Sequence, residues 1–231
     1  MAFGETPNGA PERSELDSEC TVSVLGALPE TIVHGAMGTS RPPFRLVIPS
    51  ASQTVGPFFN YGLTANHALG ILAREGAQGE RIRLRFRILD GEGKATPGDS
   101  MIELWQADAQ GRYAHPADLR SSQVDPNFHG FGRLETDVDG TCTSETIKPG
   151  PVDSTSAPHI NVALFARGLL KQLHTRVYFQ GDARNATDPV LKLVPQERRA
   201  TLLAQPVAGE PNTWSIEIRL QGEGETVFFE V

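Results

Sequence analysis

The residues best suited to chemistry are a histidine and an asparagine two positions apart, His159 and Asn161, at the start of an apolar stretch. Side chains at positions i and i+2 of a strand point to the same face, so both would face one side of a sheet. Two imidazoles in this arrangement would chelate a metal, but a neutral carboxamide is a much poorer ligand for a transition metal. Because a metal site needs several convergent ligands, His159 alone fits a hydrogen-bonded structural histidine better than a ligand.

The motifs of common enzyme classes do not occur in the sequence. It contains no dinucleotide-binding fingerprint, P-loop, paired-cysteine metal site or G-x-S-x-G nucleophile turn. None of the six histidines pairs with another at metal-ligand spacing on a predicted helix. Read residue by residue, the sequence gives no complete catalytic set.

Two glycine-rich loops are the remaining candidates for a binding site. Residues 52–59 (SQTVGPFF) suit a rigid loop whose backbone approaches a ligand, although composition alone favours a purely structural turn. Residues 125–133 (DPNFHGFGR) end in Arg133, whose planar guanidinium could hold a carboxylate through two parallel hydrogen bonds. The alternative for Arg133 is a surface ion pair with a local acid such as Glu135.

The elements that must position these residues are mostly short strands. The clearest is Arg81–Leu89, where apolar residues alternate with arginines at period two, so one face is buried. It is expected to form a hairpin-like pair with Met101–Gln106. Further extended segments are expected at 132–146 (with a turn at Asp139-Gly140), 160–166, 175–179, 214–220 and 226–231.

Helical signals are few, at 66–75 behind an Asn cap and at 196–205 after Pro195. The pattern predicts an all-β fold, a β-sandwich of about seven to eight strands with a few peripheral helices and long loops.

Charge and composition exclude several classes of protein. The net charge of −7, with basic residues scattered among acids, argues against a nucleic-acid-binding surface. No apolar run reaches the length of a membrane span, and the start lacks the layout of a signal peptide, so a cytoplasmic protein is expected. Cys20 and Cys142 fit no metal-ligand spacing and are expected to be reduced thiols.

The chain is expected to divide into two parts. Residues 1–45 are rich in Gly, Pro, Ser, Thr and Glu, which predicts a flexible leader or arm. Residues 46–231 are long enough for one β-sandwich domain with its own core.

Seven segments in a fixed order resemble a known family. They are SQTVGPFF (52–59), IELWQADAQGRY (102–113), DPNFHGFGR (125–133), TIKPGPV (146–152), APHINVALFARG (157–168), LHTRVYF (173–179) and IRLQGEGETVFFEV (218–231). Together they resemble the intradiol ring-cleavage dioxygenases, and within that family the alpha chains of the protocatechuate 3,4-dioxygenases. The resemblance spans about residues 46–231.

The resemblance implies that this chain has no catalytic or metal-binding residues of its own. In the family, the related beta chain holds Fe³⁺ with two tyrosinates and two histidines. The corresponding positions here are Arg120, Val152, His159 and Asn161, so only one keeps a metal-binding side chain. Tyr113 is near the first tyrosine position but would need a register shift.

The implied role is to pair with an iron-bearing beta subunit and to line a substrate pocket at the interface. Thr54, Gly56 and Pro57 are the expected pocket-lining residues, and Arg133 is the candidate cation for the substrate carboxylate, unless it stabilises its own loop. The implied reaction is intradiol cleavage of 3,4-dihydroxybenzoate by O₂ to 3-carboxy-cis,cis-muconate. Two alternatives stay open: a self-sufficient dioxygenase that uses His159, and a non-enzymatic transthyretin-like binding or scaffold module.

Overall fold

Eight strands make up the fold, and most begin where the alternation of apolar and polar residues predicts them. The computed structural model describes residues 51–54, 56, 62–96 and 100–230. The strands are β1 (Arg81–Leu89), β2 (Met101–Gln106), β3 (Phe131–Glu135), β4 (Thr141–Ile147), β5 (His159–Phe165), β6 (Leu173–Phe179), β7 (Leu203–Pro206) and β8 (Thr213–Arg219).

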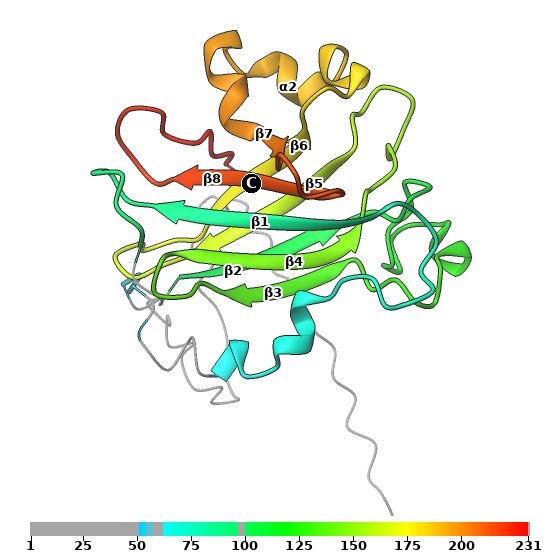
Figure 1. Cartoon of the computed structure of the whole chain (residues 1–231), viewed down its shortest axis with the longest axis horizontal. Coiled ribbons are helices and arrows are strands. Elements are labelled where there is room, and N and C mark those ends of the chain that lie inside the picture. The colour runs from blue at the N-terminus through cyan, green and yellow to red at the C-terminus, as the bar shows by residue number, and fades with distance from the viewer. Residues whose placement is uncertain (1–50, 55, 57–61, 97–99, 231) are drawn as a thin grey trace, which may run out of the picture. The chain divides into compact units, whose positions relative to one another are not determined.

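The strands form two facing layers of one continuous sheet. Their order is β3-β2-β5-β6-β7-β8-β1-β4, and neighbours are antiparallel except for the pairs β1–β8 and β6–β7. Figure 1 shows β8, β1 and β4 in the layer nearer the viewer, with β2, β5 and β6 behind them. The short strand β7 pairs with both β6 and β8 and so connects the two layers.

The core lies between the layers and follows from period-two alternation. In β1, Ile82, Leu84, Phe86 and Ile88 are buried, while the arginines between them point outward. These side chains pack with Ile160 of β5 and with similar residues of the other strands in one cluster. Such burial of apolar surface is the main source of stability in a β-sandwich.

The end strands β3 and β4 do not pair with each other in the ladder, and a short segment lies beside them. Helix η1 (His67–Gly70) is capped by Asn66, whose side chain accepts from the Ala68 N–H. After it, the Leu72 N–H donates to the Glu145 carbonyl at 2.9 Å. This segment covers the β4 edge, which limits the exposure of unpaired backbone groups.

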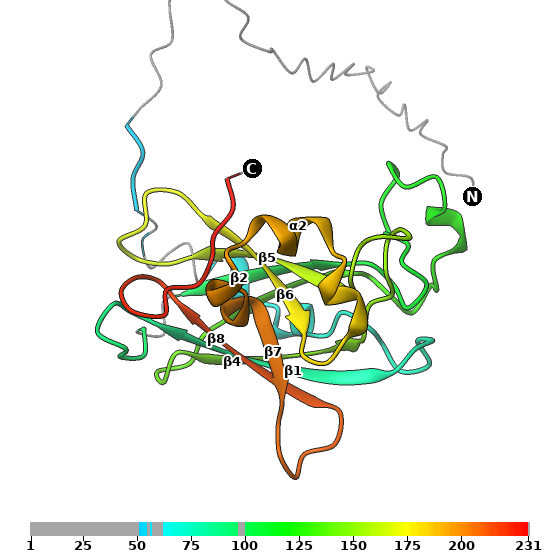
Figure 2. The same ribbon diagram turned by 90° about the horizontal axis from the view of Figure 1, so that it is seen from above.

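The remaining helical segments are short and lie mostly between β6 and β7. They are η2 (Ser121–Gln123), η3 (Ala183–Ala186), α2 (Pro189–Leu193) and η4 (Gln196–Leu202). Figure 2 shows α2 against the end of the sheet near β5 and β6. The buried Asp188 caps α2 and also accepts from the Ala157 N–H at 2.8 Å, so it joins this helix to the segment before β5. In the described part of the chain, no helix is long and apolar enough to cross a membrane.

The fold confirms the β-sandwich and corrects several predicted elements. β1 and β2 are not a hairpin pair, because β1 is bordered by β4 and β8, and β2 by β3 and β5. The predicted helix at 196–205 ends at Leu202 and continues as β7, since Ala204 joins the core. The predicted helix at 66–75 is one short turn. Within the described residues of the predicted strand at 226–231, pairing is limited to a bridge between Phe229 and His174.

The division into a leader and a domain stays a prediction. Residues 1–50 lie outside the described residues, so the expected leader at 1–45 falls there entirely.

Candidate functional site

The outer face of the β2, β5 and β6 layer carries two of the predicted site residues, His159 and Asn161. His159 pairs with Tyr178 across β5 and β6, and Asn161 pairs with Arg176. On its other side, Asn161 is opposite Trp105 of β2. Because Ile160 alternates into the core, His159 and Asn161 share the face that points away from it.

His159 is a buried histidine with a backbone partner. Its Nδ1 lies 2.9 Å from the Ala157 carbonyl oxygen, and its ring lies 5.6 Å from the ring of Tyr178. Burial lowers the pKa of His159, an effect partly opposed by the bond to Ala157. The contact is that of a neutral imidazole that donates through Nδ1 to the carbonyl.

Arg120 is held inside its own loop by a carboxylate. Its Nε and Nη2 donate to the two oxygens of Asp118 at 3.1 and 3.0 Å, and Nη2 also donates to the Gly111 carbonyl at 2.9 Å. The same carboxylate accepts from the Tyr113 N–H at 2.9 Å. These hydrogen bonds keep the pKa of Asp118 well below its usual range, with the Arg120 side chain as the largest cause. The loop from Gly111 to Arg120 is therefore tied together by an ion pair.

Val152 lies against the same loop. Gly111 has a φ of +75°, and a Cβ there would overlap the Pro151 carbonyl oxygen and approach the Val152 Cα. Only glycine allows this approach without strain. Since Arg120 bonds to the Gly111 carbonyl, the positions 120 and 152 meet around this glycine.

Tyr113 connects this loop to the sheet face. Its ring is stacked on Trp105 at a centroid distance of 5.8 Å and an angle of 7°. Burial raises the pKa of Tyr113, while its hydrogen bond with Asn161 and the charge of Arg176 lower it in part. Burial also raises the pKa of Tyr178 to about 12. Both phenols stay protonated at neutral pH.

The donor set at these positions does not fit a ferric ion. A guanidinium, an isopropyl group and a carboxamide occupy three of the four positions, and the fourth is the imidazole bound to Ala157. Ferric iron prefers anionic oxygen and imidazole donors, which Arg120, Val152 and Asn161 do not provide. Across the described ranges, no group of three or more His, Cys, Asp and Glu side chains could hold a metal.

The predicted pocket-lining loop lies at the other end of β5. The Thr54 hydroxyl accepts from the Gly168 N–H at 2.6 Å, in the turn after β5. Gly56 is exposed, and Pro57 lies outside the described residues. Since β5 runs seven residues from His159, roughly 20 Å separate this turn from His159, one of the predicted degenerate ligand positions. The structure thus places these two groups of predicted residues at opposite ends of β5.

Arg133 is engaged by an acid, but not by the one expected from sequence. Its Nε and Nη2 both donate to Oε1 of Glu103 on the neighbouring strand, at 2.8 and 2.6 Å. Its guanidinium also lies 5.5 Å from the centre of the Phe131 ring. Glu135, the predicted partner, instead accepts from the Thr64 hydroxyl at 2.9 Å.

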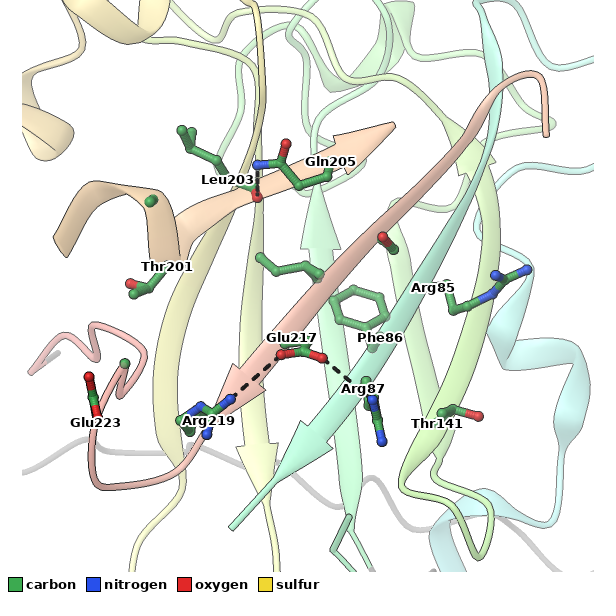
Figure 3. A pocket seen from close by; sticks show the side chains of 14 residues that line it. Arg85, Phe86, Arg87, Thr141, Thr201, Leu203, Gln205, Glu217, Arg219 and Glu223 are labelled. Atoms are coloured by element: carbon green, nitrogen blue, oxygen red, sulfur yellow. Dashed lines mark hydrogen bonds and ion pairs between the residues drawn. The ribbon is translucent and has the colours of Figure 1, made fainter. Parts of the chain in front are cut away.

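Two of the hollows on the described surface are the largest by volume. One of about 700 Å³ is lined by Trp105, Tyr113, His115, Ala117, Asp118, Leu119 and Arg120. A second, of about 840 Å³, lies where the ladder between β7 and β8 ends after two residue pairs. Figure 3 shows Glu217 of the second hollow between Arg87 and Arg219, at 3.5 and 3.7 Å. The aromatic hollow is the better candidate site, because Arg120, one of the predicted positions, lines it.

Sequence reasoning missed Asp118, Arg176 and the aromatic pair of Trp105 and Tyr113. Because side chains alternate along a strand, Arg176 points away from the core that buries its neighbours Thr175 and Val177. The sequence of this segment alone does not show which strand pairs with it. The proximity of Asp118 and Arg120 in sequence was the one local signal of their ion pair.

Comparisons with known proteins agree with this geometry. The sequence profile of the family described as Dioxygenase matches residues 54–222. The chain is 42% identical over 193 residues to the protocatechuate 3,4-dioxygenase alpha chain of Burkholderia cepacia, which covers 78% of this chain and 96% of that one. It is 42% identical over 205 residues to the alpha chain of Pseudomonas putida, covering 81% and 99%.

More distant matches extend the comparison to a related subunit and to a solved structure. The beta chain of the Burkholderia cepacia enzyme is 38% identical over 133 residues, covering 55% of this chain and 56% of that one. The dioxygenase domain of a carbohydrate-binding protein fusion from Streptomyces sp. SirexAA-E matches with a TM-score of 0.52 and 26% identity, covering 66% of this chain and 87% of that one.

Proposed function

Because this chain belongs to the intradiol dioxygenase family and groups with the alpha chains of protocatechuate 3,4-dioxygenase, we propose that it is the non-catalytic subunit of such an enzyme. Its partner is a homologous beta subunit that holds Fe³⁺. The observation that carries this proposal is the occupation of three ligand positions by Arg120, Val152 and Asn161. With these side chains the subunit contributes no iron ligands, and catalysis requires the companion chain.

The place of the Thr54 loop supports a role toward the partner. The loop is fixed to the turn after β5, roughly 20 Å from His159, one of this chain's own degenerate positions. A loop so distant cannot line a pocket centred on that residue. It is available instead to the pocket of a partner, where Thr54, Gly56 and Pro57 would form a wall.

The proposed reaction of the complex is intradiol cleavage of 3,4-dihydroxybenzoate to 3-carboxy-cis,cis-muconate. The iron of the partner supplies the activation of the catechol toward O₂. This chain contributes positioning of the aromatic ring and exclusion of water from the interface pocket. The proposal includes a cytoplasmic location for this chain.

For Arg133 we favour the structural alternative over a direct contact with the substrate carboxylate. Two of its donors are already taken by Glu103, and its plane packs on Phe131. Turning the guanidinium toward a substrate would leave Glu103 half-buried without its partner.

Co-expression with a homologous beta chain tests the proposal. Each chain alone and the co-purified complex are assayed for iron content and for O₂ uptake with protocatechuate and with catechol. The complex is expected to be active, whereas this chain alone is expected to lack iron and activity. Stoichiometric iron with tyrosinate-to-iron absorption in the single chain would show a self-sufficient dioxygenase. A chain that forms no complex and gives no activity would favour the scaffold alternative.

A further inference from the structure

The sheet face that carries the degenerate ligand positions has an excess of positive charge. Arg133 is paired with Glu103, and Arg120 is paired with Asp118. Arg176 lies on β6 and is only partly exposed. In the portion of the chain that the structure describes, no salt bridge involves Arg176, whose side chain is hydrogen-bonded only with the neutral Tyr178 phenol.

The carboxylates nearest to this face are committed to other donors. Asp188 is buried and accepts from the N–H groups of Ala157, Val190 and Leu191, and from the Tyr178 hydroxyl. Asp153 accepts from the backbone and side chains of the residues that follow it, Thr155 and Ser156. Neither carboxylate is within ion-pair distance of Arg176. A half-buried cation without a counter-charge is unfavourable, which indicates an anionic partner that is not among the described residues.

The neighbours of Arg176 define what kind of anion would fit. Arg176 is directly opposite Asn161, which is opposite Trp105 on the next strand. The backbones of Arg176 and Trp105 are therefore two strand spacings apart, about 10 Å in total. The charge of Arg176 reaches Tyr113, whose hydroxyl is hydrogen-bonded with Asn161. Trp105 and Tyr113 form the stacked wall of the 700 Å³ hollow.

We propose that Arg176, with Asn161 and the Trp105–Tyr113 wall, forms a binding site for a small aromatic carboxylate in this subunit itself. The guanidinium holds the carboxylate, and the ring of the ligand packs beside the indole. Asn161, whose Nδ2 donates to the Trp105 carbonyl at 3.3 Å, fixes the strand between the two groups. The loss of metal ligands has thus changed a face suited to a cation into one suited to an anion. This site goes beyond the proposed function, because it requires neither iron nor the partner.

Titration of the isolated full-length chain with benzoate tests the site, since no partner pocket can then contribute. Trp105 is one of two tryptophans, so indole fluorescence reports on binding, in a buffer free of organic acids. Benzoate is expected to give a saturable change with a Kd on the order of millimolar, as for a ligand of this size. Benzyl alcohol, which has the ring without the charge, is expected to bind at least about tenfold more weakly.

Matched variants assign the binding to Arg176. Arg176→Met is expected to weaken benzoate binding at least about tenfold, and Arg176→Lys, which keeps the charge, to weaken it less. The control is Arg83→Met, which removes an exposed arginine of β1 that faces Glu145 at 4.0 Å. Thermal unfolding of each variant shows that it is folded.

Two results would overturn the site. One is a wild-type chain without saturable binding of benzoate, and the other is equal affinity in wild type and in folded Arg176→Met. Neither result bears on the co-expression experiment, so this inference and the proposed function can fail separately.

Discussion

Arg133 offers a direct test of whether a conspicuous arginine acts on substrate or on the fold. Its Nε and Nη2 donate to one carboxylate oxygen of Glu103, and the two side chains are 22% and 25% exposed. The guanidinium also packs over Phe131. Hydrogen bonds to charged groups contribute about 1.5 to 3 kcal/mol, and an exposed cation–π contact about 0.5 to 1 kcal/mol.

These contributions set the expected size of the effect. Partial exposure reduces them, so Arg133→Ala is expected to lower the free energy of unfolding by about 2 kcal/mol. A double-mutant cycle with Glu103→Ala is expected to give a coupling energy of about 1 kcal/mol. Urea unfolding of the isolated chain measures both values.

The kinetic readout separates the two roles. In the assembled enzyme, Arg133→Ala is expected to change the KM for protocatechuate by less than about twofold, because the guanidinium is engaged by Glu103. A substrate contact of 1.4 kcal/mol or more would raise KM about tenfold. A tenfold higher KM together with unchanged stability and no coupling to Glu103 would refute the structural assignment.

Four further outcomes are expected. Thr54→Val should raise KM in the complex by removing the bond to Gly168, whereas Thr187→Val, at an exposed hydroxyl of η3, should not. Burial lowers the pKa of His159, so the unfolded chain binds more protons than the folded chain at acidic pH. Stability should therefore fall as the pH drops below about 6.5. In urea unfolding at pH 5.5 and 7.5, His159→Gln should reduce this pH dependence. Burial raises the pKa of Cys142 to about 12, so mass spectrometry should find it alkylated by iodoacetamide at pH 8 only after unfolding. Gly111→Ala should destabilise by about 2 kcal/mol or more, because its φ is positive and its Cβ would overlap Pro151, while Gly181→Ala, where the space is open, should cost less. Equal effects within either matched pair, unaltered pH dependence in His159→Gln, or alkylation of the native thiol would contradict the respective argument.

Local sequence was sufficient for the strands whose alternation is strong. The predicted bounds of β1 and β2 match the structure, because inward and outward positions repeat every two residues along a single segment. The same local reasoning failed at 196–205, where a helix-like composition gives way to β7 at Leu203. There, packing of Ala204 into the core outweighs helix propensity.

The identity of the side chains at the degenerate positions is likewise a property of the sequence. Arginine, valine and asparagine lack the donors for ferric iron wherever the fold places them. The residues that face each other across strands cannot be predicted in this way, because strand register depends on contacts between segments far apart in the chain. Only the tertiary structure could show that Glu103, rather than Glu135, neutralises Arg133, and that Thr54 bonds to Gly168. For the same reason, only the structure could reveal Arg176 beside Asn161 without a carboxylate, since a missing partner is defined by everything that surrounds a charge in space.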